Sequence, residues 1–150
     1  MNPFDLKTAL LAKHAQHVVM MHFPLALFMA SLAFDLLALW RGNRALATAA
    51  YYNLTAAAVA TLPAVATGLL AWQWQLGGAR LKGNLRLHLL LGLSSSAMIW
   101  LLYGWRARLQ RKPGQRLTPG YLAAQVIAAA LVTLTGHLGG ILSGVQVPPS

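Results

Sequence analysis

Four long apolar segments constrain this chain more than any other feature of its sequence. They lie at about residues 18–40, 45–74, 85–105 and 121–142. A helix needs roughly 20 mostly apolar residues to cross a bilayer, and each segment reaches that length. The stretches between them carry glycine, proline or basic residues, which are typical of turns. The sequence therefore predicts an all-α integral membrane protein with four transmembrane helices.

The connections between these segments are short, and short connections make successive helices antiparallel. We therefore expect an antiparallel four-helix transmembrane bundle that forms a single domain over residues 1–150. The first span contains His22 and Asp35 and is too long for a signal-peptide core, so we expect it to be retained. Residues 1–16 are predicted to form an interfacial amphipathic segment, although a simple extension of the first span explains the same pattern.

The composition excludes several classes of site. The chain is 57% hydrophobic and 9% charged, whereas soluble proteins carry about a quarter charged residues. It has no cysteine, which excludes disulfides, thiolate metal sites and covalently attached haem. Its two acidic residues are Asp5 and Asp35, so chemistry that depends on paired carboxylates is nearly excluded. The net charge of +10 does not indicate nucleic-acid binding, because the basic residues flank the apolar segments.

The same basic residues predict an orientation. We call the membrane face at which the first span begins the near face, and the opposite one the far face. Cytoplasmic loops carry an excess of Lys and Arg. Five basic residues fall on the near face and seven on the far face: Lys7, Lys13, Arg80, Lys82 and Arg86 against Arg41, Arg44, Arg106, Arg108, Arg111, Lys112 and Arg116. We therefore expect a multi-pass protein of the bacterial inner membrane, with the near face and both termini in the periplasm.

Four histidines fall in the near half of this arrangement. His17 and His22 begin the first span, His88 begins the third, and His137 lies in the last two turns of the fourth. Ionisable residues inside a membrane are costly and usually functional. A lone histidine at a helix end is more often an interfacial residue bonded to a carbonyl, but three helices here contribute to one layer. We expect at least two of the four to be ligands.

The residues around this layer favour a haem. Imidazole binds haem iron, zinc and copper, but a zinc hydrolase also needs an activated water and commonly a carboxylate base, which this layer lacks. A b-type haem needs two axial nitrogens and apolar walls of small residues, and Gly92, Gly136 and Gly140 lie beside the histidines. We expect one or two haem b groups. Copper or zinc is the minor alternative, since Met20 and Met21 adjoin the layer.

Spacing limits which histidines can share one iron. His17 and His22 are five residues apart and so point about 140° apart on a helix. We therefore place His22, His88 and His137 first and His17 as a further candidate. Arg80, Lys82 and Arg86 are positioned to neutralise haem propionates, whereas Trp72 and Trp74 are typical of an interfacial aromatic belt. For Asp35, near the far end of the first span, we expect a salt bridge or hydrogen bond to a far-face basic residue.

Three motifs resemble a known family of bacterial membrane proteins, called domain of unknown function 2231. They are the string from His17 to Leu27 (H-x-x-x-x-H-F-P-L-A-L) followed by F-D-L-L at Phe34 to Leu37, the third-span His88, and T-G-H-L-G-G-x-L from Thr135 to Leu142. The resemblance covers about residues 14–146. The family often has proline after the first histidine, where this chain has Val18. Its members are often fused to, or neighbours of, Rieske-type and c-type cytochrome domains, so the resemblance implies electron transfer.

These observations predict a membrane-bound b-type cytochrome. It would transfer electrons between a quinol or partner subunit and a periplasmic redox protein, such as a Rieske-type or c-type cytochrome. We expect an electron-transfer protein rather than a stand-alone enzyme, in contact with the lipid bilayer and possible as an oligomer, with no nucleic-acid partner. One alternative is a copper-binding, zinc-binding or pH-sensing membrane protein. Another is an accessory subunit of a respiratory assembly without its own cofactor.

Overall fold

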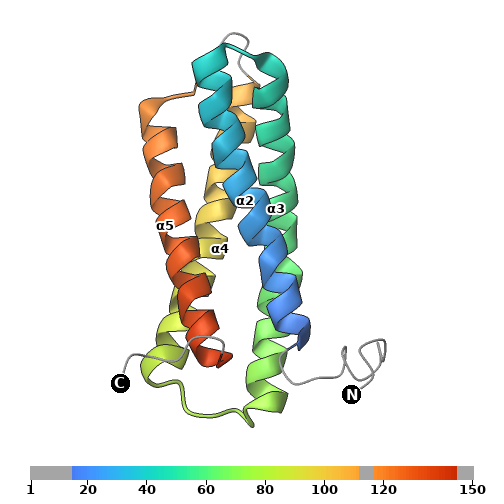
Figure 1. Cartoon of the computed structure of the whole chain (residues 1–150), viewed down its shortest axis with the longest axis vertical. Coiled ribbons are helices and arrows are strands. Elements are labelled where there is room, and N and C mark those ends of the chain that lie inside the picture. The colour runs from blue at the N-terminus through green and yellow to red at the C-terminus, as the bar shows by residue number, and fades with distance from the viewer. Residues whose placement is uncertain (1–14, 112–116, 145–150) are drawn as a thin grey trace.

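A computed structural model describes residues 15–111 and 117–144 of the chain. Four long helices and one π-helical turn follow one another in sequence: α2 (Ala15–Arg41), α3 (Arg44–Leu70), η1 (Ala71–Gln75), α4 (Gly83–Gln110) and α5 (Pro119–Leu142). Figure 1 shows the long helices side by side as a bundle. Each is long and apolar enough to cross a membrane, so the predicted all-α four-helix membrane bundle is confirmed. The interfacial segment was predicted over residues 1–16. Residues 1–14 lie outside the described residues, and the last two, Ala15 and Gln16, belong to α2.

Local sequence signals set the turns of the bundle. Gly42 adopts a φ of 63°, which glycine tolerates, in the two-residue turn between α2 and α3. Asn43 then caps α3, because its side-chain oxygen accepts hydrogen bonds from the backbone N–H groups of Ala45 (2.8 Å) and Leu46 (3.4 Å). At the start of α5, Thr118 accepts a hydrogen bond from the N–H of Tyr121 at 3.3 Å. Both turns lie at the far end of the bundle, opposite the start of α2 (Figure 1).

The helices extend beyond the apolar segments that predicted them. The third span was expected over residues 85–105, and α4 runs from Gly83 to Gln110. Apolarity marks only the hydrocarbon layer, whereas the helical hydrogen bonds continue into the interface, where long basic side chains reach water. The second span was expected to end at Trp74, and η1 carries it through Gln75.

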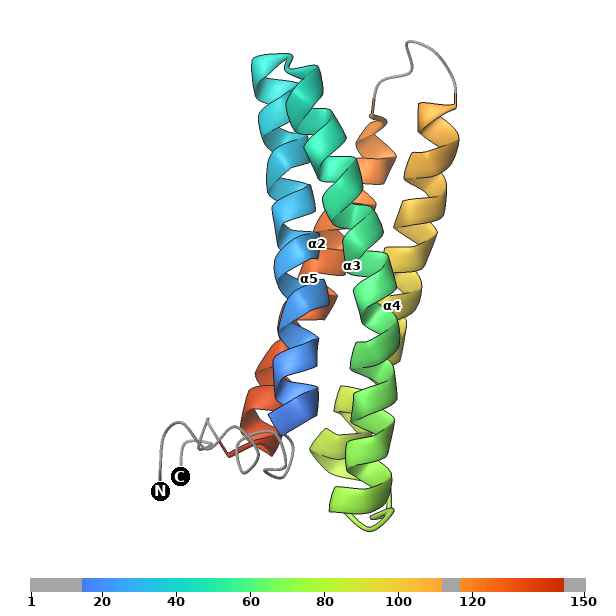
Figure 2. The same ribbon diagram turned by 90° about the vertical axis from the view of Figure 1, so that its right-hand side faces the viewer.

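The bundle consists of two helical hairpins. α2 packs on α3 over most of its length, and α4 packs on α5, whereas α2 and α5 touch over a shorter stretch. Seen from the side of α3, this helix runs between α2 and α4 (Figure 2). Its buried positions are mostly alanine, including Ala50, Ala57 and Ala64. Small side chains let helix backbones approach closely in lipid, where packing drives association.

The two halves of the bundle differ in packing. The buried residues of α4 begin at Ser95 and continue toward its far end, and those of α5 end at Val132. The near halves of both helices therefore contribute no buried side chain among the described residues. Large apolar side chains such as Phe23 (54% exposed) and Leu101 (69% exposed) cover the outside, as expected for a surface in contact with lipid. The core accordingly occupies the middle and far half, and the near half is left open.

Candidate functional site

A cavity of about 390 Å³ occupies the near half of the bundle. Side chains of all four long helices line it, together with residues of η1 and of the connection to α4. Its inner end lies at Thr61, Ile99 and Val132, and its other end lies beside Leu76 and Ala79 at the near end. The lining is mostly aliphatic. Such a cavity suits a largely apolar ligand that enters from the near face or from lipid.

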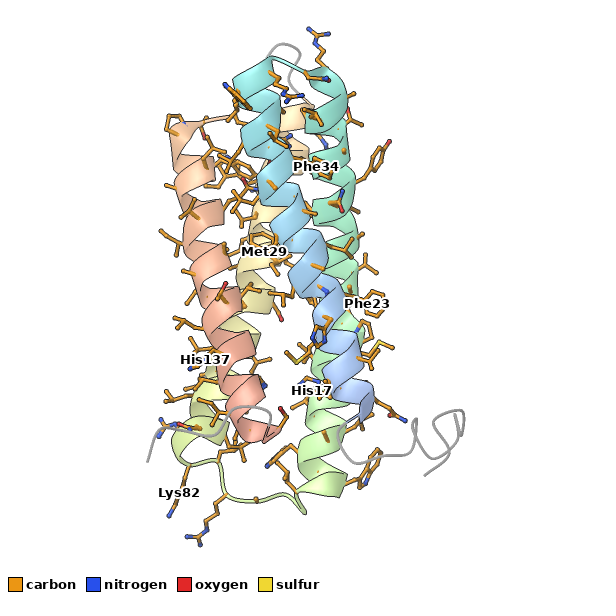
Figure 3. The ribbon with its side chains drawn as sticks, viewed as in Figure 1. His17, Phe23, Met29, Phe34, Lys82 and His137 are labelled. Carbon is orange, nitrogen blue, oxygen red and sulfur yellow. The ribbon has the colours of Figure 1, made fainter. Side chains whose placement is uncertain are left out.

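Two of the predicted histidines face this cavity from different helices. His17 of α2 and His88 of α4 both line it, and both are half-buried. Their ring centroids are 6.1 Å apart, and the ring planes are inclined at 80° to each other. Figure 3 labels His17 near the start of α2, at the end of the bundle where α5 finishes. The structure therefore brings together one pair of imidazoles from the predicted layer.

Backbone carbonyl groups fix the tautomer of both rings. The Nδ1 atom of His17 lies 3.1 Å from the carbonyl oxygen of Ala64, and the Nδ1 atom of His88 lies 3.1 Å from that of Thr135. A carbonyl oxygen only accepts hydrogen bonds, so Nδ1 carries the proton in each ring. The lone pair of each neutral imidazole is then on Nε2. This is the arrangement of histidines that bind metals in proteins, in which a hydrogen bond from the other nitrogen orients the ring.

Glycine residues on the neighbouring helices make room for both rings. A Cβ atom at Gly68 of α3 would lie 2.8 Å from Cε1 of His17. One at Gly139 of α5 would lie 3.2 Å from Cε1 of His88 and 3.6 Å from the terminal methyl of Met21. Met21 also lines the cavity. The haem site predicted from the sequence included neither Gly68 nor Met21, although Gly68 lies four residues after Ala64, on the same face of α3.

The other two predicted histidines lie on the outside of the bundle. His22 is exposed, and its Nδ1–H donates to the carbonyl oxygen of Val18 in its own helix. His137 is exposed on α5 (Figure 3). The cavity lining includes neither of them. Of the predicted glycines, Gly92 and Gly136 line the cavity, while Gly140 lies outside its lining.

Hydroxyl groups gather toward the inner end of the cavity. The Oγ atom of Ser95 lies 3.2 Å from Oγ1 of Thr135. The indole N–H of Trp100 donates to Oγ1 of Thr61 at 3.1 Å. All three hydroxyl-bearing residues line the cavity. Their bonds to one another and to Trp100 hold α3, α4 and α5 in register around the histidine pair.

The near end of the cavity carries positive charge. The indole N–H of Trp72 donates to the carbonyl oxygen of Ala79 at 2.9 Å and so fastens the connection between η1 and α4. Arg80 and Lys82 are exposed in this connection, and Arg86 is exposed in the first turn of α4. Figure 3 shows Lys82 at the near end, below the helices. Anionic groups of a ligand at this end would therefore meet basic side chains.

The donor set limits the metal chemistry. Within residues 15–111 and 117–144, no group of three or more His, Cys, Asp or Glu side chains is close enough to hold a metal ion. A structural or catalytic zinc site uses three or four protein ligands. Of the described His, Cys, Asp and Glu side chains, only two imidazoles, those of His17 and His88, line the cavity.

Asp35 lies away from the cavity, as expected. Its carboxylate oxygen Oδ1 is 2.9 Å from Nη2 of Arg106, and both side chains are buried. Arg106 was assigned to the far face, so the predicted salt bridge of Asp35 to a far-face basic residue is confirmed. The pair joins α2 to α4 in the far half of the bundle.

The family comparison agrees with the motifs. A family model described as a predicted membrane protein (DUF2231) matches residues 13–146. The chain belongs to this family. Its first motif supplies His17 to the cavity, and its closing motif supplies the Thr135 carbonyl and Gly139 that contact His88. In this DUF2231 protein, the same two motifs also contain the outward-facing His22 and His137. A search of curated proteins and a search of solved structures returned no match.

Proposed function

We propose that this DUF2231 protein is a membrane-bound b-type haem protein in electron transfer, in which His17 and His88 would hold the haem iron. The observation that supports the proposal is the pair of imidazoles that face an apolar cavity, each with its Nδ1–H donated to a backbone carbonyl. Because His22 and His137 lie on the outer surface, we no longer place them first among the ligands.

The spacing of the two rings fits one shared metal ion. Two imidazoles that bound one ion through metal–nitrogen bonds of about 2.0–2.1 Å would have ring centroids at most about 6.5 Å apart. The observed separation is 6.1 Å. The apolar lining and the close approach of Gly68 and Gly139 to the rings also fit a flat, hydrophobic cofactor. Donor chemistry, spacing and surroundings are thus compatible with a haem.

The residues of this chain would hold the haem and tune it. A bound haem supplies reversible one-electron transfer at its iron. The bonds from Nδ1 to the carbonyls of Ala64 and Thr135 orient the rings and raise the basicity of Nε2. The aliphatic lining excludes water and so influences the reduction potential. At the near end, Arg80, Lys82 and Arg86 offer positive charge to the propionates.

The position of the cavity indicates which electron donors and acceptors could reach it. The cavity lies in the near half, so electrons would be exchanged at the near face, which the distribution of basic residues assigns to the periplasm of a bacterial inner membrane. A quinol reaches this depth from the bilayer, and a partner subunit can supply electrons in the same way. A periplasmic Rieske-type or c-type cytochrome is the corresponding acceptor.

An absorption spectrum tests the proposal. The protein, purified in detergent from haem-replete cells and supplemented with haemin, should show a Soret band, and an α band after reduction with dithionite. His17→Ala and His88→Ala should each lose the six-coordinate spectrum and most of the bound haem. His22→Ala and His137→Ala are the matched controls, since each removes an exposed imidazole, and both should keep the wild-type spectrum.

Two results would overturn the assignment. A purified protein without a Soret band after supplementation would exclude a haem role. A spectrum lost in His22→Ala or His137→Ala, but kept in His17→Ala, would move the ligands to the outer surface of the bundle.

A Cu(I) site is a second candidate, and Met21 favours it. The methyl of Met21 and Cε1 of His88 both lie against the same glycine, Gly139. Two imidazoles and a thioether form a soft donor set that suits Cu(I). Copper measured by elemental analysis should then be stoichiometric without porphyrin, and Met21→Leu should lower the affinity for Cu(I). Under the haem proposal, Met21→Leu retains the Soret band and only shifts the potential.

A further inference from the structure

The far half of the bundle contains a second group of buried polar side chains, which the haem proposal does not use. We call Asp35, Arg106, Tyr121 and Gln125 the far-half polar cluster. Their exposed fractions are 1%, 4%, 0% and 0%. They come from three helices, α2, α4 and α5. Polar groups buried in a transmembrane bundle need partners, because the surrounding lipid offers none.

Part of the cluster is satisfied within the protein. Arg106 Nη2 lies 2.9 Å from Oδ1 of Asp35 and also donates to the carbonyl oxygen of Ala47 at 3.1 Å. The side-chain amide of Gln125 donates to Oδ2 of Asp35 at 3.1 Å. Opposite charges therefore meet around the carboxylate, and the cluster as a whole is neutral.

Four side-chain atoms of the cluster have no hydrogen-bond partner among the described residues, and one of them, Oδ1 of Asp35, is compensated by Arg106 in the ion pair. The other three are Nε of Arg106, the side-chain oxygen of Gln125 and the hydroxyl of Tyr121. Buried polar atoms in native structures nearly always have a partner, and leaving one unpaired costs about 1–3 kcal/mol. Three unpaired atoms in one cluster therefore indicate a ligand with which they pair.

The three side chains that carry these atoms adjoin one another. Tyr121 and Gln125 are four residues apart and project from the same face of α5. The guanidinium carbon of Arg106 lies 5.7 Å from the centroid of the Tyr121 ring. Arg106 and Gln125 both bond to the carboxylate of Asp35. The three side chains thus lie at the same ion pair, and they come from two helices.

The chemistry of the three atoms specifies the ligand. Nε–H of Arg106 donates, the amide oxygen of Gln125 accepts, and the hydroxyl of Tyr121 does either. An anion would be repelled by Asp35 and a cation by Arg106. A water molecule accepts and donates at once, is neutral, and binds where two to four polar partners converge.

We infer that the far-half polar cluster binds water held by Arg106, Gln125 and Tyr121. The site is close enough to the far face for exchange with the aqueous phase, since Asp35 lies six residues, about 9 Å along the helix, from the end of α2 at Arg41. The bundle would then have an apolar ligand cavity in its near half and a hydrated ion pair in its far half. This inference does not depend on the haem proposal.

X-ray radiolytic footprinting tests the inference directly, because a bound water is converted to hydroxyl radical beside the side chains that hold it. The full chain is reconstituted in lipid nanodiscs, exposed in millisecond pulses, and analysed by mass spectrometry. Oxidation rates are divided by those of the same residue in the SDS-unfolded chain. Phe28 is the matched control, because it is an equally buried aromatic residue (0% exposed) in the apolar core.

We expect Tyr121 to be oxidised several-fold faster than Phe28, with ¹⁸O incorporated after brief mixing with H₂¹⁸O. Gln125→Leu removes an acceptor of the water and should lower the Tyr121 rate toward that of Phe28. A low Phe28 rate in this variant verifies that it is folded. Equal rates for Tyr121 and Phe28 in the wild-type protein would overturn the water site. An unchanged Tyr121 rate in Gln125→Leu would remove Gln125 from it.

Discussion

The position of the His17 ring depends on the absence of a side chain on the facing helix. The ring is held by its bond to the Ala64 carbonyl, and Gly68 lies one turn further along the same helix. Three of its atoms, Cε1, Nδ1 and Nε2, would lie within 3.4 Å of a Cβ at Gly68. The orientation of the His17 imidazole thus depends as much on this glycine as on the carbonyl that accepts its hydrogen bond.

Gly68→Ala is therefore predicted to displace His17. A Cβ atom 2.8 Å from Cε1 forces the ring to move and strains its hydrogen bond to Ala64. We expect haem content to fall several-fold after supplementation with haemin, measured by the pyridine haemochrome assay. Gly104→Ala is the matched control, because a Cβ there meets no atom within 4 Å. Equal haem content in both variants would show that His17 does not need this position.

The angle between the two rings makes a spectroscopic prediction. The planes of His17 and His88 are inclined at 80°, and nearly perpendicular axial imidazoles give low-spin ferric haem an EPR signal with a single large g value. We expect that signal from the oxidised protein at liquid-helium temperature, unchanged in His137→Ala. A rhombic spectrum with three resolved g values, typical of parallel imidazoles, would contradict the observed ring geometry as that of the bound state.

At the scale of single residues, the order of the four spans predicted the depth of the histidines in the bundle. It did not predict which of their side chains point inward. His17, His22, His88 and His137 all lie in the near half, as expected from the order of the spans. Successive residues turn by about 100°, so His22 points about 140° away from His17. Which of the two faces inward depends on how α2 is rotated against α3 and α5, and four apolar helices with small residues on several faces do not specify that rotation.

The helices are joined at the far end by charge as well as by packing. Asp35 of α2 contacts Arg106 of α4 and Gln125 of α5, while Arg106 reaches the carbonyl of Ala47 in α3. The far-half polar cluster therefore links both hairpins. Replacing one residue of a buried ion pair with an uncharged residue leaves the charge of the other without compensation.

We predict that Asp35→Leu lowers the free energy of unfolding by about 3–5 kcal/mol, because the Arg106 charge remains buried. Unfolding in mixed micelles with increasing SDS, followed by circular dichroism, measures this change. The double variant Asp35→Leu, Arg106→Met removes both charges and should recover most of the loss. A double variant as unstable as the single one would show that packing at these positions, rather than the unpaired charge, determines stability.

The sequence predicted the four helices, but it predicted neither the π-helical turn nor the cavity. Apolar length identified all four spans, because a membrane helix must satisfy its own backbone. The π-helical turn over Ala71–Gln75 changes the hydrogen-bonding pattern without changing the apolar pattern, so composition did not reveal it. The cavity also escaped prediction, since it depends on loose packing between the near halves of the hairpins rather than on any single segment.

At the scale of the whole molecule, the two ends of the bundle differ in packing. The buried residues of α4 and α5 lie in the middle and far half of the bundle, and neither helix, over its described length, has a buried residue toward the near end. The cavity occupies that end. The proposed periplasmic location of the histidine pair therefore depends on the orientation of the bundle, which is only a prediction from the excess of basic residues on the far face.

Single cysteines can determine that orientation, because the chain contains none. Asn84 is exposed at the near end of α4, and Ala45 is exposed at the far end of α3. Replacing either with cysteine leaves the number of basic residues unchanged, so the topology signal is preserved. In intact cells with a permeabilised outer membrane, a membrane-impermeant maleimide should label Asn84→Cys at once and Ala45→Cys only after the inner membrane is disrupted. Labelling in the reverse order would place the histidine pair on the cytoplasmic side and remove periplasmic cytochromes as its direct partners.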